Sequence, residues 1–314
     1  MARGLVDVHH HVVPVSYFEY LASKGINHPS VFESAESSHL AMMDEYGIER
    51  AVLSVAAPGV HFGDDKEARD QARRINEFSA DLAARYPDRF SYFACLPLPD
   101  VDGAIEEVLH SLKDGSAKGV VLLTNIQGRY LGYPDFDPLM EELANEKALV
   151  FVHPTPMQGM HQPRFRPALA DFLLDTTRAA IGLVTSGTVS RFPDLRFILS
   201  HGGGFVPYAA HRIAWLSEMF DDKYNDGRAG MSADEILAGL RSFYFDLALS
   251  SSGPQLAALL NFTDTRHLLY GSDWPYAGER TVTHFLEEYE GFGDLTTEQR
   301  AQIARGTAAD LGLV

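Results

Sequence analysis

The chain is poor in cysteine, in basic residues and in long apolar runs. A single cysteine, Cys95, among 314 residues allows neither an internal disulfide nor a zinc site built from cysteines. No apolar run approaches the roughly 18 residues that a membrane-spanning helix needs. Lys and Arg number 26 against 43 Asp and Glu, which gives a formal net charge of −17. Without a basic run, so acidic a chain is not expected to bind nucleic acids or anionic membranes.

The amino-terminal residues also lack the apolar core of a secretory signal, because charged residues and histidines occur within the first ten positions. We therefore expect a cytoplasmic protein. Apolar residues make up 46% of the chain and charged residues 22%, an ordinary balance for a globular protein. This composition excludes a disordered, collagen-like or coiled-coil chain. Cys95 lies in an apolar run, so a buried and unreactive thiol is expected.

Short apolar or β-branched runs recur along the chain, each about as long as a buried parallel strand. The eight runs cover residues 5–8, 51–55, 90–96, 119–123, 149–152, 197–199, 243–247 and 268–270. Segments with the apolar spacing of helices lie between most of them, at residues 65–86, 101–114, 137–147, 168–191, 233–241 and 296–311. Asp65, Asp102 and Asp137 stand where three of these helices need N-caps.

Eight strands alternating with helices predict an α/β protein with a (β/α)8 TIM-like barrel, and residues 1–314 are expected to form one domain. The rival doubly wound sheet should carry a glycine-rich phosphate-binding turn after its first strand, and this sequence has none there. Two longer segments interrupt the alternation. We expect residues 12–45 to form a small cap over the barrel mouth and residues 205–235 to be a second insertion.

Reactive side chains lie at the end of the first predicted strand, in the sequence Asp7-Val8-His9-His10-His11. Because alternate side chains of a strand share one face, His9 and His11 should point into the barrel while His10 points toward the helices. Two imidazoles at this spacing suit a divalent metal ion. The alternative is a pair of core histidines satisfied by ordinary hydrogen bonds.

Three more strands end in a histidine or an aspartate: Val-His-Pro at 152–154, His-Gly-Gly-Gly at 201–204 and Ser-Asp-Trp at 272–274. Singly, each has a plain explanation: a histidine bonded to a loop carbonyl, a glycine turn beside a histidine, and an aspartate that caps the next helix. The glycines would also let the backbone approach a ligand. Functional residues of a barrel lie at the carboxyl ends of its strands, so together these residues predict one metal site.

The same motifs resemble those of the amidohydrolase superfamily. In chain order they are Asp-Val-His-His-His-Val-Val-Pro, Val-His-Pro, Ser-His-Gly-Gly-Gly and Tyr-Gly-Ser-Asp-Trp-Pro, and the resemblance runs from His9 to about Pro275. Within the superfamily the sequence looks like the branch that contains the aminocarboxymuconate-semialdehyde, γ-resorcylate and 6-methylsalicylate decarboxylases. The resemblance implies a barrel enzyme with one divalent ion, usually zinc and sometimes manganese.

The resemblance also implies roles for individual residues. The metal ligands would be His9, His11, His153 and Asp273. His201 would act as the general acid or base beside the ion, and Asp273 would share in catalysis. Arg212, eleven residues after His201, matches an arginine that binds the carboxylate of a small-molecule substrate across a dimer interface. A homodimer is therefore implied.

The chain departs from the muconate-semialdehyde enzyme at two arginine positions. Residues 12–49 contain no arginine, and the second distal arginine is replaced by Phe220. Both losses favour a substrate with a single carboxylate, such as a hydroxybenzoate. Lys118 precedes the fourth strand instead of following it, so the bridging lysine of two-metal hydrolases has no counterpart. A single ion is favoured.

Several further residues are candidates for the mouth of the barrel. An aromatic wall for the substrate would be formed by Phe172, Trp274, Tyr276 and Phe205, with ordinary core packing as the alternative for each. Asp246 ends the seventh strand and resembles a recurrent acidic position of this branch, or it holds neighbouring loops together. His161 is close enough to His153 in the sequence to line the mouth, and His39 is expected to be a surface or packing residue.

Three functions compete at this point. The resemblance favours a metal-dependent, non-oxidative decarboxylase of a small aromatic or unsaturated acid. A hydrolase of a lactone, amide or ester would use the same ion and the same histidine to activate water. A barrel that only binds a ligand is the third, and the complete set of five site residues opposes it. Release of carbon dioxide distinguishes the first function from the second.

Overall fold

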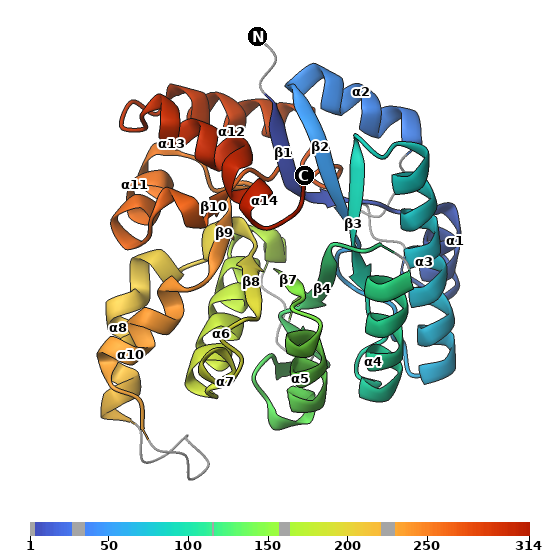
Figure 1. Ribbon diagram of the computed structural model, residues 1–314, viewed down its shortest axis with the longest axis horizontal. Helices are drawn as coiled ribbons and strands as arrows, with labels where there is room; N and C mark the ends of the chain where they lie inside the picture. Colours follow the sequence, from blue (N-terminus) through green and yellow to red (C-terminus); the bar gives the residue numbers. More distant parts are fainter. Residues whose placement is uncertain (1–3, 27–34, 115, 157–163, 221–229) are drawn as a thin grey trace.

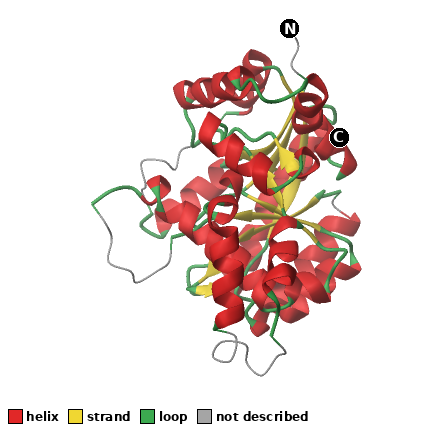
Figure 2. Ribbon diagram, turned by 90° about the vertical axis from the view of Figure 1, so that its left-hand side faces the viewer, coloured by secondary structure: helices red, strands yellow, loops and turns green. Residues whose placement is uncertain are grey.

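The computed structural model describes residues 4–26, 35–114, 116–156, 164–220 and 230–314. Eight parallel strands form one sheet, and helices surround it (Figures 1 and 2). In sheet order the strands are β1 (Leu5–His11), β2 (Ile48–Ser54), β3 (Phe90–Cys95), β4 (Gly119–Leu123), β7 (Leu149–His153), β8 (Arg196–Leu199), β9 (Tyr244–Asp246) and β10 (Leu268–Leu269). Each strand lies beside the next one along the chain. This order confirms the predicted barrel and differs from the reversing order of a doubly wound sheet.

The barrel closes between β1 and the segment that follows β10. His11 N donates to Trp274 O at 2.6 Å, and Asp273 N donates to His9 O at 2.8 Å. These bonds replace a regular strand ladder, because β10 is only two residues long. They also bring three of the predicted metal ligands, His9, His11 and Asp273, onto neighbouring backbones.

Apolar side chains fill the barrel below these residues. The rings of Phe93 and Phe151 stack with centroids 5.6 Å apart, and they belong to a buried cluster that also contains Val6, Val8, Val52, Val121, Leu149, Ile198 and Leu269. We call this cluster the floor. Val6 and Val8 point into the barrel, and the register between β1 and β2 shifts after Asp7. Because of this shift, His9 and His11 also point into the barrel, above the floor.

Most helices lie in the outer layer and connect successive strands, and the last three follow β10. They are α1 (Val15–Ser23), α2 (Glu36–Tyr46), α3 (Asp65–Arg85), α4 (Val101–Leu109), α5 (Asp137–Asn145), α6 (Asp171–Thr185), α7 (Thr188–Arg191), α8 (Val206–Met219), α10 (Ala233–Arg241), α11 (Gly253–Phe262), α12 (Glu279–Gly291), α13 (Thr297–Ala301) and α14 (Thr307–Asp310). The predicted helix 168–191 is interrupted between α6 and α7, where Gly187 has a φ of 74°. A short hairpin of β5 (Asn125–Ile126) and β6 (Arg129–Tyr130) follows β4.

The predicted helix caps were displaced by one or two residues. Asp64, not Asp65, accepts the capping hydrogen bond of α3, and Asp100, not Asp102, caps α4. Asp137 does not cap α5, whose N-cap position is occupied by Phe136 without a side-chain bond. In each case the N-cap residue precedes the first helical turn. The predicted aspartate lies inside that turn, where its negative charge interacts favourably with the helix dipole.

The two predicted insertions are partly described. Tyr17 and Tyr20 of α1 donate hydrogen bonds to Gly59 O at 2.8 Å and Val60 O at 2.9 Å, in the loop after β2. Because that loop follows the carboxyl end of a strand, α1 covers the mouth as the expected small cap. By contrast, α2 packs against β2 in the outer layer (Figure 1). In the second insertion, α8 and α10 flank residues that lie outside the described ranges.

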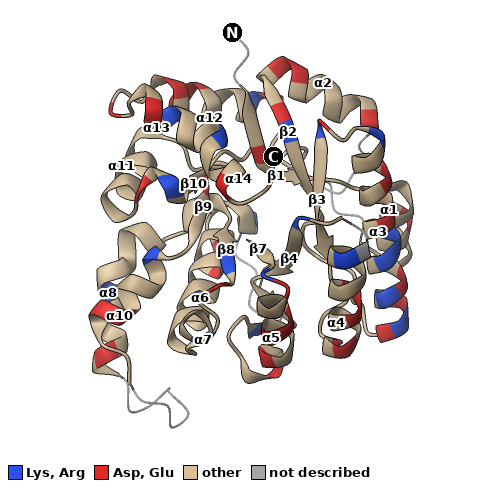
Figure 3. Ribbon diagram, viewed as in Figure 1, with Lys and Arg blue, Asp and Glu red and all other residues tan. Residues whose placement is uncertain are grey.

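Charged residues of both signs are interspersed over the outer helices in the view of Figure 3. Arg191 of α7 forms a two-pronged ion pair with Asp137 of α5, at 2.7 and 2.8 Å. Within the described ranges, no helix has both the length and the apolar character needed to cross a membrane. The cytoplasmic location stays a prediction.

Candidate metal centre and active site

Three histidines and one aspartate converge at the carboxyl ends of β1 and β7 and just after β10. One potential ligand atom from each of His9, His11, His153 and Asp273 lies within 4.8 Å of the others, and all four residues are buried. His9 Nε2 is 3.0 Å from His11 Nε2, and both nitrogens are 3.2 Å from Asp273 Oδ1. The structure thus brings together the four side chains singled out from the sequence, and their binding of an ion stays a prediction.

Each imidazole of this cluster has a hydrogen-bond partner at Nδ1. His9 Nδ1–H donates to Asp246 Oδ2 at 2.8 Å, and His153 Nδ1–H donates to the next backbone carbonyl at 2.9 Å. His11 Nδ1 lies 3.1 Å from Ser54 Oγ. A proton held at Nδ1 leaves the lone pair of Nε2 free, and partners of this kind are the usual support of metal-bound histidines.

The electrostatics of the cluster favour added positive charge. Burial lowers the pKa of His9, but the carboxylates of Asp246 and Asp273 outweigh burial and raise it to about 10. Burial lowers the pKa of His11 to about 4 and the pKa of His153 well below its usual value. Burial raises the pKa of Asp273, yet the positive charge of His9 holds it well below the ordinary range. His11 and His153 are thus neutral, and His9 carries a proton that a divalent ion would displace from Nε2. The three imidazoles and the ionised carboxylate would then form a donor set that fits such an ion.

Asp246 joins the cluster to His201. Its Oδ1 accepts hydrogen bonds from His201 N at 3.0 Å and Ala248 N at 2.9 Å, while its Oδ2 accepts from His9. His201 Nδ1–H donates to Ala248 O at 3.1 Å, and the ring centroids of His201 and His9 are 4.9 Å apart. Burial and the charge of His9 lower the pKa of His201, which favours a neutral imidazole with a free Nε2. Asp246 therefore both contacts a histidine of the cluster and holds the backbone of the segments after β8 and β9 together, so both roles considered for it are observed.

His201 and Asp273 both adopt the left-handed backbone conformation, with φ of 54° and 60°. This conformation costs a residue other than glycine on the order of 1–3 kcal/mol and persists only where the surroundings impose it. Asp273 does not cap the following helix, because the N-cap of α12 is Gly278. The capping alternative for Asp273 is therefore wrong, and its carboxylate is free to face the histidines.

The glycines after His201 serve the packing of the turn. A Cβ on Gly203 would lie 2.6 Å from ring atoms of Phe245, and a Cβ on Gly204 would lie 2.1 Å from Leu173 O. At these two glycines β9 and α6 occupy the space that a side chain would need, and the approach of a ligand to their backbone stays a prediction. Their positive φ values, 70° and 64°, also favour glycine.

Sequence reasoning missed Asp7 and Ser272. Asp7 is fully buried, and its Oδ1 accepts hydrogen bonds from His9 N at 3.1 Å and Ser272 N at 3.0 Å. Its Oδ2 accepts from Ser272 Oγ at 2.6 Å. Asp7 thus ties β1 to the segment that carries Asp273. A carboxylate inside an otherwise apolar strand is the signal that could have revealed it, because a buried charge needs partners.

Behind Asp7, two further histidines fill the space between β1 and α2. Asp7 Oδ2 lies 2.9 Å from His10 Nδ1, and His10 Nε2 lies 2.8 Å from His39 Nδ1. His10 therefore points toward the helices, as its position in the strand predicted. His39 is a buried packing residue and not a surface one.

The predicted substrate contacts are divided between the site and the surface. The ring centroid of Phe172 lies 6.4 Å from that of His153, and that of Tyr276 lies 5.2 Å from that of His11. Trp274 is partly buried, and its Nε1 has no hydrogen-bond partner within the described part of the chain. Phe205 is 38% exposed. Of the four aromatic residues predicted for the wall, Phe172 and Tyr276 thus have their rings beside the histidines.

Two other predicted residues lie away from the cluster. Arg212 is exposed on α8, and no described residue forms an ion pair or hydrogen bond with it. Lys118 donates its backbone N–H to Tyr92 O at the start of β4, far from the strand end where a bridging lysine would stand. His161 lies outside the described residues.

Comparisons with known proteins agree with this geometry. A family model described as Amidohydrolase matches residues 6–311. The chain belongs to the amidohydrolase family. This amidohydrolase is 38% identical over 325 residues to decarboxylase yanB of Aspergillus niger, with 98% of this chain and 86% of the relative covered. It is 33% identical over 322 residues to 6-methylsalicylic acid decarboxylase of Penicillium expansum, with coverage of 98% and 95%.

A solved structure extends the likeness of this amidohydrolase to the whole barrel. The 5-carboxyvanillate decarboxylase of Novosphingobium aromaticivorans, complexed with manganese and 4-hydroxy-3-methoxy-5-nitrobenzoic acid, matches with a TM-score of 0.87 at 20% identity. The match covers 99% of this chain and 97% of the other. The fold is therefore shared, and the family resemblance inferred from the motifs is confirmed.

Proposed function

We propose that this amidohydrolase is a metal-dependent carboxy-lyase that removes carbon dioxide from a small aromatic acid of the hydroxybenzoate type. The observation that carries the proposal is the buried convergence of three histidines and an aspartate beside His201. Relatives named as decarboxylases match nearly the whole chain, which favours decarboxylation over hydrolysis. An unsaturated, non-aromatic acid is the alternative substrate of the same reaction.

One divalent ion would be held by His9, His11, His153 and Asp273. We propose zinc, which nitrogen-rich sites of this kind commonly bind, with manganese as the alternative. Manganese is the metal named for the structurally similar 5-carboxyvanillate decarboxylase. When bound, the ion would supply a Lewis acid that orients a hydroxyl and a carboxylate oxygen of the substrate.

The reaction needs a proton at the carbon that carries the carboxylate. When the bond from the ring to the carboxylate breaks, its electron pair stays on the ring carbon, carbon dioxide leaves, and the carbon takes up a proton. His201 is one group proposed to exchange this proton, through Nε2, because its Nδ1–H is committed to Ala248 O. Asp273 is the second proposed catalytic group, since its carboxylate lies among the same histidines.

We further propose that the protein forms a homodimer in which Arg212 of one copy binds the carboxylate of the substrate held in the active site of the other copy. Arg212 shares one face of α8 with Tyr208, Trp215 and Met219, because the four residues are spaced by four, three and four positions. Those three apolar side chains are 88%, 61% and 64% exposed, and a contiguous apolar surface of this kind is typical of an interface. Burying it against a second copy would carry Arg212 to the neighbouring barrel.

The dimer proposal is tested with two variants. Trp215→Glu should shift the sedimentation coefficient to that of a monomer and lower the turnover of a carboxylate substrate. Arg212→Ala should keep the dimer and the metal content but lower kcat/KM about 10- to 100-fold, the loss expected for a two-pronged charged contact. An unchanged kcat/KM for Arg212→Ala would contradict the role of this arginine.

The decarboxylase proposal is tested by supplying a panel of 2-hydroxybenzoates and measuring carbon dioxide and the corresponding phenol. Lactones, amides and esters are tested in parallel. We expect carbon dioxide release that disappears after treatment with a chelator and returns when zinc or manganese is added. Hydrolysis without carbon dioxide would establish the alternative function, and undiminished turnover after complete metal removal would refute the metal-dependent mechanism.

A further inference from the structure

The three imidazoles of the candidate metal centre are held in different ways. The Nδ1 partners of His9 and His11 are side chains at the ends of β9 and β2. The Nδ1 partner of His153 is instead the carbonyl of Pro154, the next residue along the chain, at 2.9 Å. Strand β7 ends at His153, so this carbonyl lies outside the sheet. The direction of the His153 ring therefore depends on what holds the peptide bond after Pro154.

The peptide bond between Pro154 and Thr155 is held from its other side. Thr155 N donates a hydrogen bond to Thr124 Oγ1 at 3.1 Å. This peptide bond is trans, and the C=O and N–H of a planar trans peptide unit point in opposite directions. Thr124 thus fixes the plane of the same peptide unit whose oxygen accepts the ring proton of His153.

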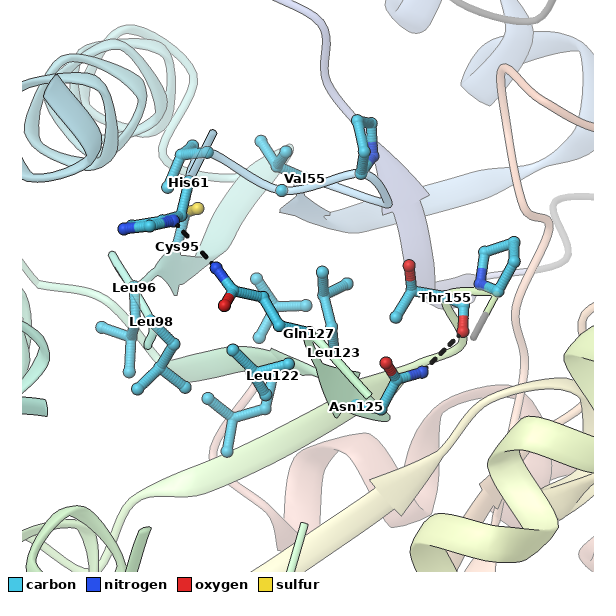
Figure 4. Close-up of a pocket in the computed structure, with 16 residues that line it drawn as sticks. Val55, His61, Cys95, Leu96, Leu98, Leu122, Leu123, Asn125, Gln127 and Thr155 are labelled. Atoms are coloured by element: carbon cyan, nitrogen blue, oxygen red, sulfur yellow. Dashed lines mark hydrogen bonds between the residues drawn. The ribbon is translucent and has the colours of Figure 1, made fainter. Parts of the chain in front are cut away.

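The backbone on both sides of Pro154 is also tied to the segment after β4. Thr124 N donates to His153 O at 2.9 Å, and Asn125 Nδ2 donates to Thr155 O at 2.9 Å (Figure 4). Together with the bond to Thr155 N, three backbone groups of the segment are therefore occupied. Pro154 O cannot turn away from the His153 ring without the loss of at least one of these hydrogen bonds.

A buried carboxylate on α6 orients both side-chain donors. Asp175 is 2% exposed, and its Oδ2 accepts hydrogen bonds from Thr124 Oγ1 and from Asn125 Nδ2, the latter at 2.9 Å. Its Oδ1 accepts a hydrogen bond from Tyr130 OH. A hydroxyl group has one proton and two lone pairs. Because the proton of Thr124 goes to Asp175, a lone pair of Thr124 Oγ1 is directed to Thr155 N–H.

The same helix carries one of the aromatic residues beside the histidines. Phe172 precedes Asp175 by three positions, so the two side chains lie on one face of α6. The ring centroid of Phe172 lies 6.4 Å from that of His153. By binding the segment after β4, Asp175 holds this face of α6 beside His153. A candidate metal ligand and an aromatic side chain of the mouth thus share one support.

We propose that Thr124 and Asp175 are positioning residues that set the orientation of the His153 imidazole and thereby the metal affinity of the centre. The proposal rests on the metal-dependent function proposed above and adds two residues that supply no ligand atom themselves. If the two residues served packing alone, their loss would lower stability without a specific change at His153. The experiments below therefore measure zinc affinity and the His153 ring separately from stability.

The first test is a pair of variants at one position. Thr124→Val removes the hydroxyl at nearly constant side-chain shape, whereas Thr124→Ser keeps it. In competition with a fluorescent chelator, we expect Thr124→Val to bind zinc about 3- to 10-fold more weakly, because loss of a direct partner of a ligand costs roughly 10- to 100-fold and Thr124 acts one peptide unit further away. Thr124→Ser should retain the wild-type affinity. An unchanged affinity in Thr124→Val overturns the proposal.

Glu107→Gln is the matched control, because Glu107 of α4 is also a buried carboxylate with several donors. It accepts hydrogen bonds from Asn76, Ser111 and Arg73. Asn76 in turn bonds to Cys95 at the end of β3, a strand that supplies none of the four candidate ligands. We expect Glu107→Gln to lower the thermal unfolding midpoint and to leave the zinc affinity unaltered. Equal weakening of zinc binding in Glu107→Gln and Thr124→Val would show a general loosening of the barrel and overturn the proposal.

The second test observes the His153 ring and requires neither zinc nor turnover. In ¹⁵N-labelled protein, the Nδ1–H bonded to Pro154 O should give a downfield proton signal that exchanges slowly with water, and its loss in His153→Asn identifies it. We expect this signal to shift or broaden in Thr124→Val and to persist in Thr124→Ser and Glu107→Gln. An unchanged signal in Thr124→Val means that Thr124 does not orient the ring, and the proposal is then wrong.

Asp175→Asn takes the place of Thr124→Val if that variant fails to fold. Asparagine keeps an oxygen for the Thr124 hydroxyl but removes the charge, which weakens the hydrogen bond. Zinc affinity and the His153 signal should change in the same direction, and wild-type values of both would overturn the proposal. Absence of zinc and manganese binding by the wild-type chain would instead refute the proposed function, and the His153 signal would still test whether Thr124 and Asp175 orient the ring.

Discussion

Asp246→Asn is the change that most sharply separates support of the metal centre from general packing. Asp246 Oδ1 accepts two backbone N–H groups, so the amide oxygen of asparagine should keep that place. The amide NH2 would then face His9 Nδ1, which lies 2.8 Å from the present Oδ2. To accept this hydrogen bond, His9 must move its own proton to Nε2. That nitrogen would no longer be a ligand.

The expected loss follows from the bond that is broken. A hydrogen bond to a charged group contributes about 1.5–3 kcal/mol, and about 1.4 kcal/mol corresponds to a factor of ten. We therefore expect Asp246→Asn to weaken metal binding roughly 10- to 100-fold, in the range found when such supporting partners are removed. At saturating metal, kcat should recover at least partly.

The assay is competition for zinc or manganese with a fluorescent chelator, combined with the rate of carbon dioxide release at several metal concentrations. Asp294→Asn, an exposed change of the same kind, is the control. Near-equal thermal unfolding midpoints would show that both variants fold. Wild-type metal affinity in Asp246→Asn would refute the reasoning, because the tautomer of His9 would then not depend on this carboxylate.

Three further changes test separate parts of the account. His201→Asn should keep the metal and lower kcat by about 10²–10⁴-fold, the usual contribution of a general acid or base, and loss of the metal in this variant would mean that His201 is a ligand. Asp7→Asn should lower the free energy of unfolding by about 1–3 kcal/mol in denaturant titrations, because Asp7 links β1 to Ser272; an unchanged midpoint would contradict that link. Burial and the charge of His10 lower the pKa of His39 from 6.5 to about 3, so the folded protein binds this proton more weakly than the unfolded chain and loses stability as the pH falls from 6.5 toward 3. His39→Gln should make this loss shallower, and an identical pH dependence of the unfolding free energy would rule the contribution out.

Much of the barrel could be predicted from local patterns. All eight apolar runs became strands of one sheet, because a strand buried on both faces needs a continuous apolar run. The alternation of side chains in the first strand also predicted that His9 and His11 share a face, whereas the register shift after Asp7 that turns this face inward leaves no local signal. The helices α11 and α12 were not predicted, although Ser252 and Gln255 form a capping box at the start of α11.

The supporting contacts of the site could not be predicted in the same way. His9 and Asp246 are 237 positions apart, so no local periodicity links them. Asp7 and Ser272 are 265 positions apart and meet only because the barrel closes between β1 and the segment after β10. The residues at the ends of the strands predict which side chains reach the barrel mouth. Which of these side chains contact one another depends on how the barrel closes.

The most direct test of the central claim is anomalous diffraction at the zinc and manganese absorption edges, from crystals of the full chain grown with either metal. The account predicts one strong peak per chain at bonding distance from His9, His11, His153 and Asp273, and its loss together with activity in Asp273→Ala. A peak elsewhere, or no peak in crystals of protein that releases carbon dioxide at its full rate, would contradict it.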